Sequence, residues 1–318
     1  MQSTRTHSTD VQTRPLRIGT RGSRLALAQA HMVRALLAAA EGVPEETHEI
    51  VVVSTAGDRI LDRPLSEIGG KGLFTEEIEA GLLDGTLDLA VHSAKDMPTK
   101  LPDGLILTGY LPREDVRDVL VGRTAPTLAE LPAGAVVGTA SLRRGALVRH
   151  LRPDLSVVSF RGNVQTRLAK LERGEVDATL LALAGLKRLD AAHVATEILS
   201  LDDFPPAVGQ GAIAVETRTD ATALRARLAA ILDDNTAVAL ACERAFLDAL
   251  DGSCRTPIAG HATVADGQVA FSGLILRPDG SATHAIRVEA PIADAVALGA
   301  SAGAELKARA GAGFFDPD

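Results

Sequence analysis

The chain has 318 residues, which is enough for two or three domains because single hydrophobic cores stop growing at roughly 250–300 residues. A net charge of -8, with one Tyr, seven Phe and no Trp, argues against a nucleic-acid partner, since such a surface repels phosphates and offers few rings for base stacking. No stretch approaches 18 consecutive apolar residues, so no membrane-spanning segment is predicted.

The N-terminus and the cysteines indicate the compartment. Residues 1–15 are polar, lack the apolar core of a secretory signal and are interpreted as a disordered leader, so the predicted location is cytoplasmic. Cys242 and Cys254 are too few for a disulfide scaffold or a thiolate metal cage. No Cys/His spacing typical of a metal site occurs, and no metal is expected.

The first part of the chain alternates strands with helices. The pattern predicts strands over 16–20, 50–54 and 86–92, and helices over 25–40 and 74–83. Such alternation is typical of parallel sheets, in which ligands bind at the carboxyl ends of the strands.

A second unit with the same rhythm follows. It has predicted strands over 118–122, 136–139, 156–160 and 177–183, and helices over 141–150 and 164–172. The two units show no obvious sequence repeat, but their common order predicts two similar lobes facing a cleft. Pro205 and Pro206 mark a boundary, after which residues 213–216 are expected to return the chain to the first lobe.

The last unit completes an α/β fold of three domains. It has predicted helices over 236–250 and 293–310, a loop over 251–256, and strands over 269–276 and 284–289. The expected domains are residues 16–111 plus 212–230, residues 117–205, and residues 234–318, the last being a small α/β domain.

Basic loops are the main candidate binding sites. Four loops place Arg or Lys beside Gly or Ser, next to a predicted strand end or helix start: Arg21 with Ser23, Lys71, Arg143 with Arg144, and Arg161 with Arg167. Free N–H groups at a helix N-terminus, joined by an arginine, make an anion site. Each loop alone fits a solvated surface, and base composition is an alternative cause of the arginine excess (27 of 33 basic residues). Four loops at equivalent places favour anion binding, and none matches a nucleotide fingerprint.

Asp96 and Cys254 are the candidates for chemistry. Asp96 lies beside Lys95 in a loop after a predicted strand; it is either a common turn carboxylate or a group that stabilises positive charge and moves protons in an arginine-lined cleft. Cys254 lies beside Arg255 in a loop, where covalent chemistry and an inert thiol are both open. Cys242 lies in an apolar helical pattern and is expected to be a buried, inert thiol.

Taken together, nine segments resemble the hydroxymethylbilane synthase family, also called porphobilinogen deaminase. They are RIGTRGSRLALAQA (17–30), GGKGLFTEEIE (69–79), DLAVHSAKDMPT (88–99), PREDVRDVLV (112–121), VGTASLRRGALV (137–148), SFRGNVQTRLAKL (159–171), ATLLALAGLKRL (178–189), AVGQGAIAVE (207–216) and DGSCRTPIAG (251–260). They stand in family order from about residue 16 to residue 261, which makes chance resemblance very improbable; beyond residue 263 the match is loose.

The resemblance implies an activity and a cofactor. The family joins four porphobilinogen molecules head to tail with loss of ammonia and releases linear 1-hydroxymethylbilane. Its primer is a dipyrromethane held by a thioether, and the attachment position falls on Cys254. The catalytic aspartate falls on Asp96, which would stabilise the cationic azafulvene formed from each porphobilinogen. The family fold has three α/β domains, of which the first two resemble two-lobed periplasmic binding proteins, and the expected assembly is a monomer.

The resemblance also assigns contacts to the cofactor or the growing pyrrole chain. The matching positions are Arg21, Ser23, Lys71, Phe74, Ser93, Lys95, Thr139, Ser141, Arg143, Arg144, Arg161, Gly162, Arg167, Arg188 and Gln210. One position departs from the pattern: some members carry a second lysine where this chain has Glu67.

Two other classes of protein remain as alternatives. A two-lobed receptor for an anionic solute would explain the paired lobes and the arginine loops, but not Cys254. A hydrolase with Cys254 as nucleophile would need a positioned base, and only His261 is near in the sequence.

Overall fold

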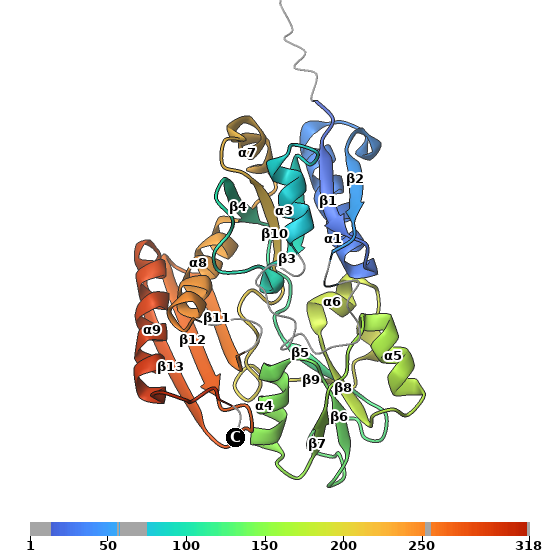
Figure 1. Ribbon diagram of the computed structural model, residues 1–318, viewed down its shortest axis with the longest axis vertical. Coiled ribbons are helices and arrows are strands. Elements are labelled where there is room, and N and C mark those ends of the chain that lie inside the picture. The colour runs from blue at the N-terminus through green and yellow to red at the C-terminus, as the bar shows by residue number, and fades with distance from the viewer. Residues whose placement is uncertain (1–13, 56, 58–74, 252–255, 317–318) are drawn as a thin grey trace, which may run out of the picture.

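The computed structural model describes residues 14–55, 57, 75–251 and 256–316. These residues form two five-stranded sheets and one three-stranded sheet, each in a separate part of the molecule (Figure 1). The predicted α/β fold of three domains is therefore confirmed.

The first domain contains a sheet with strand order β2-β1-β3-β10-β4. Its elements are β1 (Arg17–Arg21), α1 (Arg24–Glu41), β2 (Glu49–Val53), α3 (Glu76–Leu83), β3 (Leu89–Ser93), β4 (Leu105–Tyr110), β10 (Ile213–Arg218) and α7 (Thr222–Leu228). A buried core joins the sheet to α1 through residues such as Ile18, Val33, Leu37 and Leu89. The predicted return of the chain to this lobe is confirmed, because β10 pairs with both β3 and β4.

The second domain repeats this arrangement with the strand order β7-β6-β8-β5-β9. Its elements are β5 (Asp118–Gly122), β6 (Val136–Gly138), α4 (Leu142–Leu151), β7 (Ser156–Val158), α5 (Val164–Glu172), β8 (Ala178–Ala182), α6 (Leu183–Arg188) and β9 (Glu197–Ile198). The two lobes lie one above the other in Figure 1, and α1 of the first contacts α6 of the second.

Both five-stranded sheets are mixed, so the expectation of parallel sheets was only partly right. Three strands of each sheet are parallel, as helical crossovers require. However, β10 runs antiparallel to β3 and β4, and β5 runs antiparallel to β8 and β9. The reason is that the chain enters β10 and β5 directly from the other lobe. No crossover helix of the same lobe stands immediately before either strand.

The third domain packs two helices against an antiparallel sheet. Its elements are α8 (Asp234–Ala249), β11 (Ile258–Ala265), β12 (Gln268–Leu276), β13 (Thr283–Pro291) and α9 (Ala295–Ala310), with the strand order β11-β12-β13. Phe246 of α8 and Phe271 of β12 pack against each other in its core, with tilted rings whose centroids are 4.8 Å apart. Cys242 is 0% exposed and burial raises its pKa to about 12, which confirms the expected buried thiol.

The chain crosses between the lobes twice, at residues 111–117 and 206–212, and the two crossing segments are hydrogen-bonded to each other. Arg113 Nε donates to the carbonyl of Gln210 (2.9 Å). The same guanidinium holds Glu243 of α8 through two bonds of 2.6 and 3.0 Å. Glu243 is fully buried and also accepts from the backbone N–H groups of Gly209 and Ala262. One carboxylate thus ties the third domain to both crossings.

Two further observations concern the surface of the fold. Most of the expected leader, residues 1–13, lies outside the described residues, whereas Arg14 is placed by an ion pair with Asp88 (2.7 Å). In the described part of the chain, no helix has both the length and the apolar character needed to cross a membrane.

Candidate functional site

A cavity of about 500 Å³ lies where the three domains meet. The first domain contributes Lys95 and Asp96, the second contributes loops and the start of α4, and Thr256 and Ile258 come from the third. The predicted site residues that line it are Lys95, Asp96, Thr139, Ser141, Arg143, Arg144, Arg161, Arg167 and Gln210.

The charge of this cavity is strongly one-sided. Among the described residues that line it, six side chains are cationic and one is acidic: Lys95, Arg143, Arg144, Arg149, Arg161 and Arg167 against Asp96. Cations gathered in a concave site raise the local concentration of anions. Two of the four predicted anion-binding loops, those of Arg143 with Arg144 and of Arg161 with Arg167, therefore come together, and they face one carboxylate.

The start of α4 forms one wall of the cavity. Ser141 caps this helix, because its Oγ accepts from the backbone N–H of Arg144 (3.4 Å). Thr139 Oγ1 in turn accepts from the N–H of Ser141 (3.1 Å), which fixes the turn between β6 and α4. No acidic residue occupies the first turn, so the positive potential of the helix N-terminus is left for an external anion.

Arg143 and Arg144 follow this cap and are almost fully buried. Both hold Asp118 at the start of β5, through Arg143 Nη2 to Oδ2 (2.7 Å) and Arg144 Nη2 to Oδ1 (2.7 Å). Burial alone would raise the pKa of Asp118, but the two guanidinium groups outweigh it and hold that pKa well below its usual range. Two positive charges against one negative charge leave a net positive wall.

The loop between β7 and α5 supplies Arg161, and the first turns of α5 supply Arg167. Gly162 has φ of 127°, and a Cβ there would lie 2.7 Å from Thr166 Cγ2, so only glycine fits. Arg167 Nε donates to the carbonyl of Gly162 (2.8 Å), which holds the guanidinium beside Arg161. Burial and the positive charges of Arg144 and Arg161 lower the pKa of Arg167 to about 10, so it remains charged at neutral pH.

The first lobe supplies Lys95 and Asp96 from a short 3-10 turn that follows β3. Both are exposed to the cavity. Lys95 Nζ donates to Gln210 Oε1 (3.4 Å). Desolvation by the cleft walls and the charge of Arg144 lower the pKa of Lys95 to about 8. Gly209, whose φ is 74°, lies close against this turn, because a Cβ there would approach the backbone of Ala94 and Lys95 to 3.0 Å.

Five predicted residues lie outside the lining of this cavity: Arg21, Ser23, Ser93, Gly162 and Arg188. Ser23 caps α1 through the N–H of Ala26, and Ser93 exchanges hydrogen bonds with Gln29. Arg188 donates to the carbonyl of Gly211 (2.6 Å), and burial lowers its pKa.

Four sequence predictions cannot be placed. Lys71, Phe74, Cys254 and the departure at Glu67 lie outside the described residues. Thr256, two residues after Cys254, nevertheless lines the cavity.

Sequence reasoning missed Asp118 and Arg149. Asp118 is an acidic residue at the start of β5, directly before three apolar residues, and a buried charge in such a place requires a partner. An acidic residue beside an apolar strand pattern was therefore the signal in the sequence that could have identified Asp118. Arg149 lies in the last turn of α4, where nothing in the sequence separates it from an ordinary surface arginine. It lines the cavity and donates to the carbonyl of Pro278 (3.2 Å).

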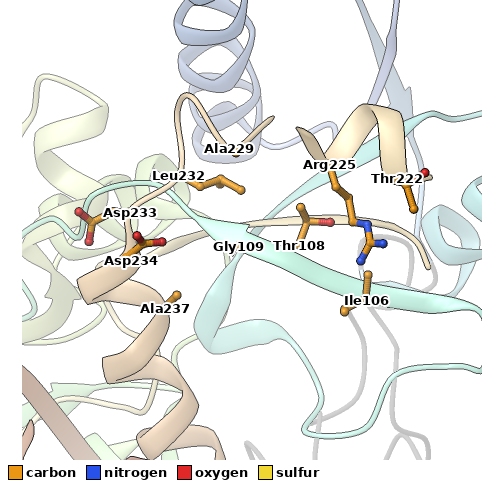
Figure 2. A pocket seen from close by; sticks show the side chains of 10 residues that line it. All are labelled: Ile106, Thr108, Gly109, Thr222, Arg225, Ala229, Leu232, Asp233, Asp234 and Ala237. Carbon is orange, nitrogen blue, oxygen red and sulfur yellow. The ribbon is translucent and has the colours of Figure 1, made fainter. Parts of the chain in front are cut away.

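A second cavity, of about 350 Å³, lies between β4, α7 and the start of α8 (Figure 2). Figure 2 shows Arg225 at one end of it and Asp233 and Asp234 at the other. None of the predicted site residues lines it. Across the described residues, no group of His, Cys, Asp and Glu is arranged to hold a metal ion.

Fold and site together define a class: an α/β protein with two lobes and a third domain, whose central cavity suits a small polyanion. Comparison with known proteins is more specific. Residues 16–226 match the family model "Porphobilinogen deaminase, dipyromethane cofactor binding domain", and residues 237–308 match "Porphobilinogen deaminase, C-terminal domain". A porphobilinogen deaminase of Nitrobacter winogradskyi is 59% identical over 298 residues, covering 94% of each chain. The chain belongs to the porphobilinogen deaminase family.

Solved structures of bacterial binding proteins are similar at a lower level. A putative methionine-binding lipoprotein of Bacillus subtilis has 13% identity and a TM-score of 0.41, covering 68% of this chain and 90% of that one. The methionine-binding protein MetQ has 12% identity and a TM-score of 0.44, covering 70% and 91%. At these TM-scores the likeness adds nothing to the sheet topologies described above.

Membership of the family gives the activity that the sequence predicted. The protein is a transferase that condenses four porphobilinogen molecules head to tail with release of ammonia and then releases linear hydroxymethylbilane. Its cofactor is dipyrromethane. The receptor and hydrolase alternatives are thereby excluded as the main function.

Proposed function

We propose that the cavity between the three domains holds the dipyrromethane and the growing pyrrole chain, with Cys254 as the attachment residue and Asp96 as the catalytic residue. One observation carries the proposal: six cationic side chains and one carboxylate line the described part of the cavity, which reaches Thr256, two residues from Cys254.

The residues present fit the cofactor. Each pyrrole unit carries an acetate and a propionate, and arginine forks bind carboxylates two bonds at a time. Among the described residues, Arg143 Nε is buried without a hydrogen-bond partner, as expected of a donor kept for a ligand. When bound, dipyrromethane supplies the pyrrole carbon to which the first incoming unit is joined.

The binding roles follow from placement. Arg143, Arg144, Arg161, Arg167 and Lys95 hold ring carboxylates from the walls of the cavity. Thr139, Ser141 and Gln210 provide neutral contacts. We extend the binding role, on the family match, to Arg21, Ser23, Lys71, Phe74, Ser93, Gly162 and Arg188.

Asp96 has a different role because it is the one acidic side chain among the described lining residues. Loss of ammonia from porphobilinogen leaves positive charge on the pyrrole, and a carboxylate fixed nearby stabilises that charge. After the new carbon–carbon bond forms, the ring carbon must lose its proton, and the Asp96 carboxylate is placed to accept it.

We also propose a cytoplasmic location, a single-chain assembly and no nucleic-acid partner. The net charge of -8 supports the last point. The proposed domain limits are residues 16–111 with 212–230, residues 117–205 and residues 234–318; the strand membership of the three sheets supports them.

The test is Asp96→Asn, which keeps the shape of the side chain and removes its charge. Removal of one preorganised electrostatic group costs about 10²–10³ in kcat. We expect kcat to fall by at least that factor while KM for porphobilinogen changes little, measured as release of ammonia and of hydroxymethylbilane.

The matched control is Asp103→Asn, an exposed aspartate in the same region that does not line the cavity. It should turn over like the wild type. Near-normal kcat in Asp96→Asn would remove Asp96 from the chemistry, and an equal loss in both variants would indicate a general structural defect.

A further inference from the structure

The buried carboxylate of Asp118 has no part in the mechanism above, yet it lies directly behind two arginines that line the cavity. It is 0% exposed and receives hydrogen bonds from three side chains: Arg143, Arg144 and Gln210. Such a residue is costly to bury, and its partners are two of the proposed carboxylate-binding arginines and a residue of the second crossing segment. Asp118 can therefore fix the orientation of all three side chains.

The contact with Gln210 fixes the orientation of its side-chain amide. Gln210 Nε2 donates to the carbonyl of Val116 (2.7 Å) and to Asp118 Oδ1 (2.9 Å), and both of these atoms only accept hydrogen bonds. A flipped amide would place Oε1 against two acceptors. The carbonyl oxygen of the amide must therefore point the other way.

In that orientation Gln210 Oε1 faces the first lobe and accepts from Lys95 Nζ (3.4 Å). Lys95 precedes Asp96 in the same short turn. An unbroken series of contacts thus runs from Arg143 and Arg144 in the second lobe, through Asp118 and Gln210, to the turn that carries the catalytic residue.

We propose that Asp118 is a positioning residue for the reaction: it holds Arg143 and Arg144 directly and, through Gln210, holds Lys95 beside Asp96. The carboxylate-binding wall of the second lobe and the catalytic turn of the first are then kept in one geometry. This inference rests on the proposed roles of Lys95 and Asp96.

Asp118 also acts on Lys95 through its charge. Besides desolvation by the cleft walls, the groups that lower the pKa of Lys95 are Arg144 and Arg143, and those that raise it are Asp96 and Asp118. Lys95 binds carboxylates as a cation, so its contribution is complete well below pH 8 and is lost as the pH rises through about 8. Removing the negative charge of Asp118 lowers this pKa further, and the loss then begins at lower pH.

The experiment compares Asp118→Asn with Asp115→Asn, both purified with cofactor and checked by intact mass. Asp115 lies three residues before Asp118, on the first crossing segment, but pairs with Arg117, outside the cavity. For Asp118→Asn we expect a KM at least about tenfold higher, equivalent to the loss of one charge-assisted contact. We also expect the basic limb of the pH profile of kcat/KM to move to lower pH. Asp115→Asn should show neither change.

A second variant, Gln210→Met, leaves both ion pairs of Asp118 intact and removes only the amide. It should raise KM by a smaller factor and move the basic limb in the same direction. It also keeps the proposal testable if Asp118→Asn does not fold. An unchanged limb in Gln210→Met would show that Lys95 is not held through Gln210 and would overturn the relay.

A third variant separates this inference from the proposed function. Lys95→Arg keeps the positive charge but does not titrate in this range, so its profile should lack the basic limb. A wild-type limb in Lys95→Arg would remove Lys95 from substrate binding and refute that part of the proposed function. A lost limb in Lys95→Arg, with Asp118→Asn behaving like Asp115→Asn, would refute only the positioning role.

Discussion

The two lobes of this protein share one strand order but differ in the charge that they bring to the cavity. The order is β2-β1-β3-β10-β4 in the first lobe and β7-β6-β8-β5-β9 in the second, and in each lobe the fourth strand of this order is the one that enters from the other lobe. Strands β1 and β6 therefore occupy equivalent places, as do β3 and β8. Both β1 and β6 lead to a serine that caps the next helix, Ser23 in one case and Ser141 in the other.

The side chains near these equivalent strands have different roles in the two lobes. Five of the six cations that line the described part of the cavity come from the second lobe, whereas Lys95 and Asp96 come from the first. The topology brings both sets of loops to one cleft, and the residues in them decide which lobe binds carboxylates and which provides one. A common fold does not by itself specify either role.

After Asp96→Asn, the variant with the largest expected kinetic effect is Arg167→Gln in the second lobe, which tests this division of roles. A hydrogen bond to a charged group contributes about 1.5–3 kcal/mol, so KM should rise by roughly tenfold to a hundredfold. Because Arg167 does not touch the reacting carbon in this account, kcat should fall much less. Steady-state kinetics give both constants.

The control for this variant is Arg173→Gln at the end of the same helix. Arg173 is exposed and pairs only with Glu175 at the surface, as far as the described contacts extend. It should keep the wild-type KM. If Arg167→Gln instead lost kcat with an unchanged KM, the division of roles between the lobes would be wrong.

A smaller effect is expected at the two capping serines. Replacement of Ser23 or Ser141 by alanine should each cost about 1 kcal/mol of the free energy of unfolding, because a helix N-terminal N–H loses its acceptor. Glycine at either position should cost only a few tenths of a kcal/mol. Denaturant titration of the four variants measures this.

The kinetic effect should distinguish the two serines, since only Ser141 lines the described cavity. Ser141→Gly should raise KM by about two- to tenfold, the range for loss of a neutral hydrogen bond, and Ser23→Gly by less. An equal rise in KM for both variants would show that both serines contribute equally to substrate binding, and it would contradict the division between the lobes.

Elements with a strong local pattern could be predicted from the sequence. The predicted limits of β5 and α5 agree with the structure, and most other limits differ by one to three residues. Strand β11, rich in Ala and Gly, was not predicted, because its pairing with β12 outweighs a weak strand propensity. Helix α6 was missed since it continues the apolar run of β8 without a break.

The site, too, could be predicted only in part from the sequence. Charged residues in short loops indicated the anion sites, and the family resemblance assigned them to pyrrole carboxylates. The partners of those residues could not be predicted: Asp118 is 25 residues from Arg143 and 92 from Gln210 in the chain, and these contacts exist only once the chain is folded. The antiparallel entry of β5 and β10 was missed for the same reason, because it depends on which lobe precedes each strand.

The central claim is that a pyrrole primer attached to Cys254 grows inside this cavity, and intact mass spectrometry tests it most directly. The active protein should be heavier than its sequence by one dipyrromethane, and brief exposure to porphobilinogen should add further pyrrole units. Cys254→Ser should show the mass of the bare chain and no turnover. An active preparation with the bare mass, or an increment that persists in Cys254→Ser, would contradict the account.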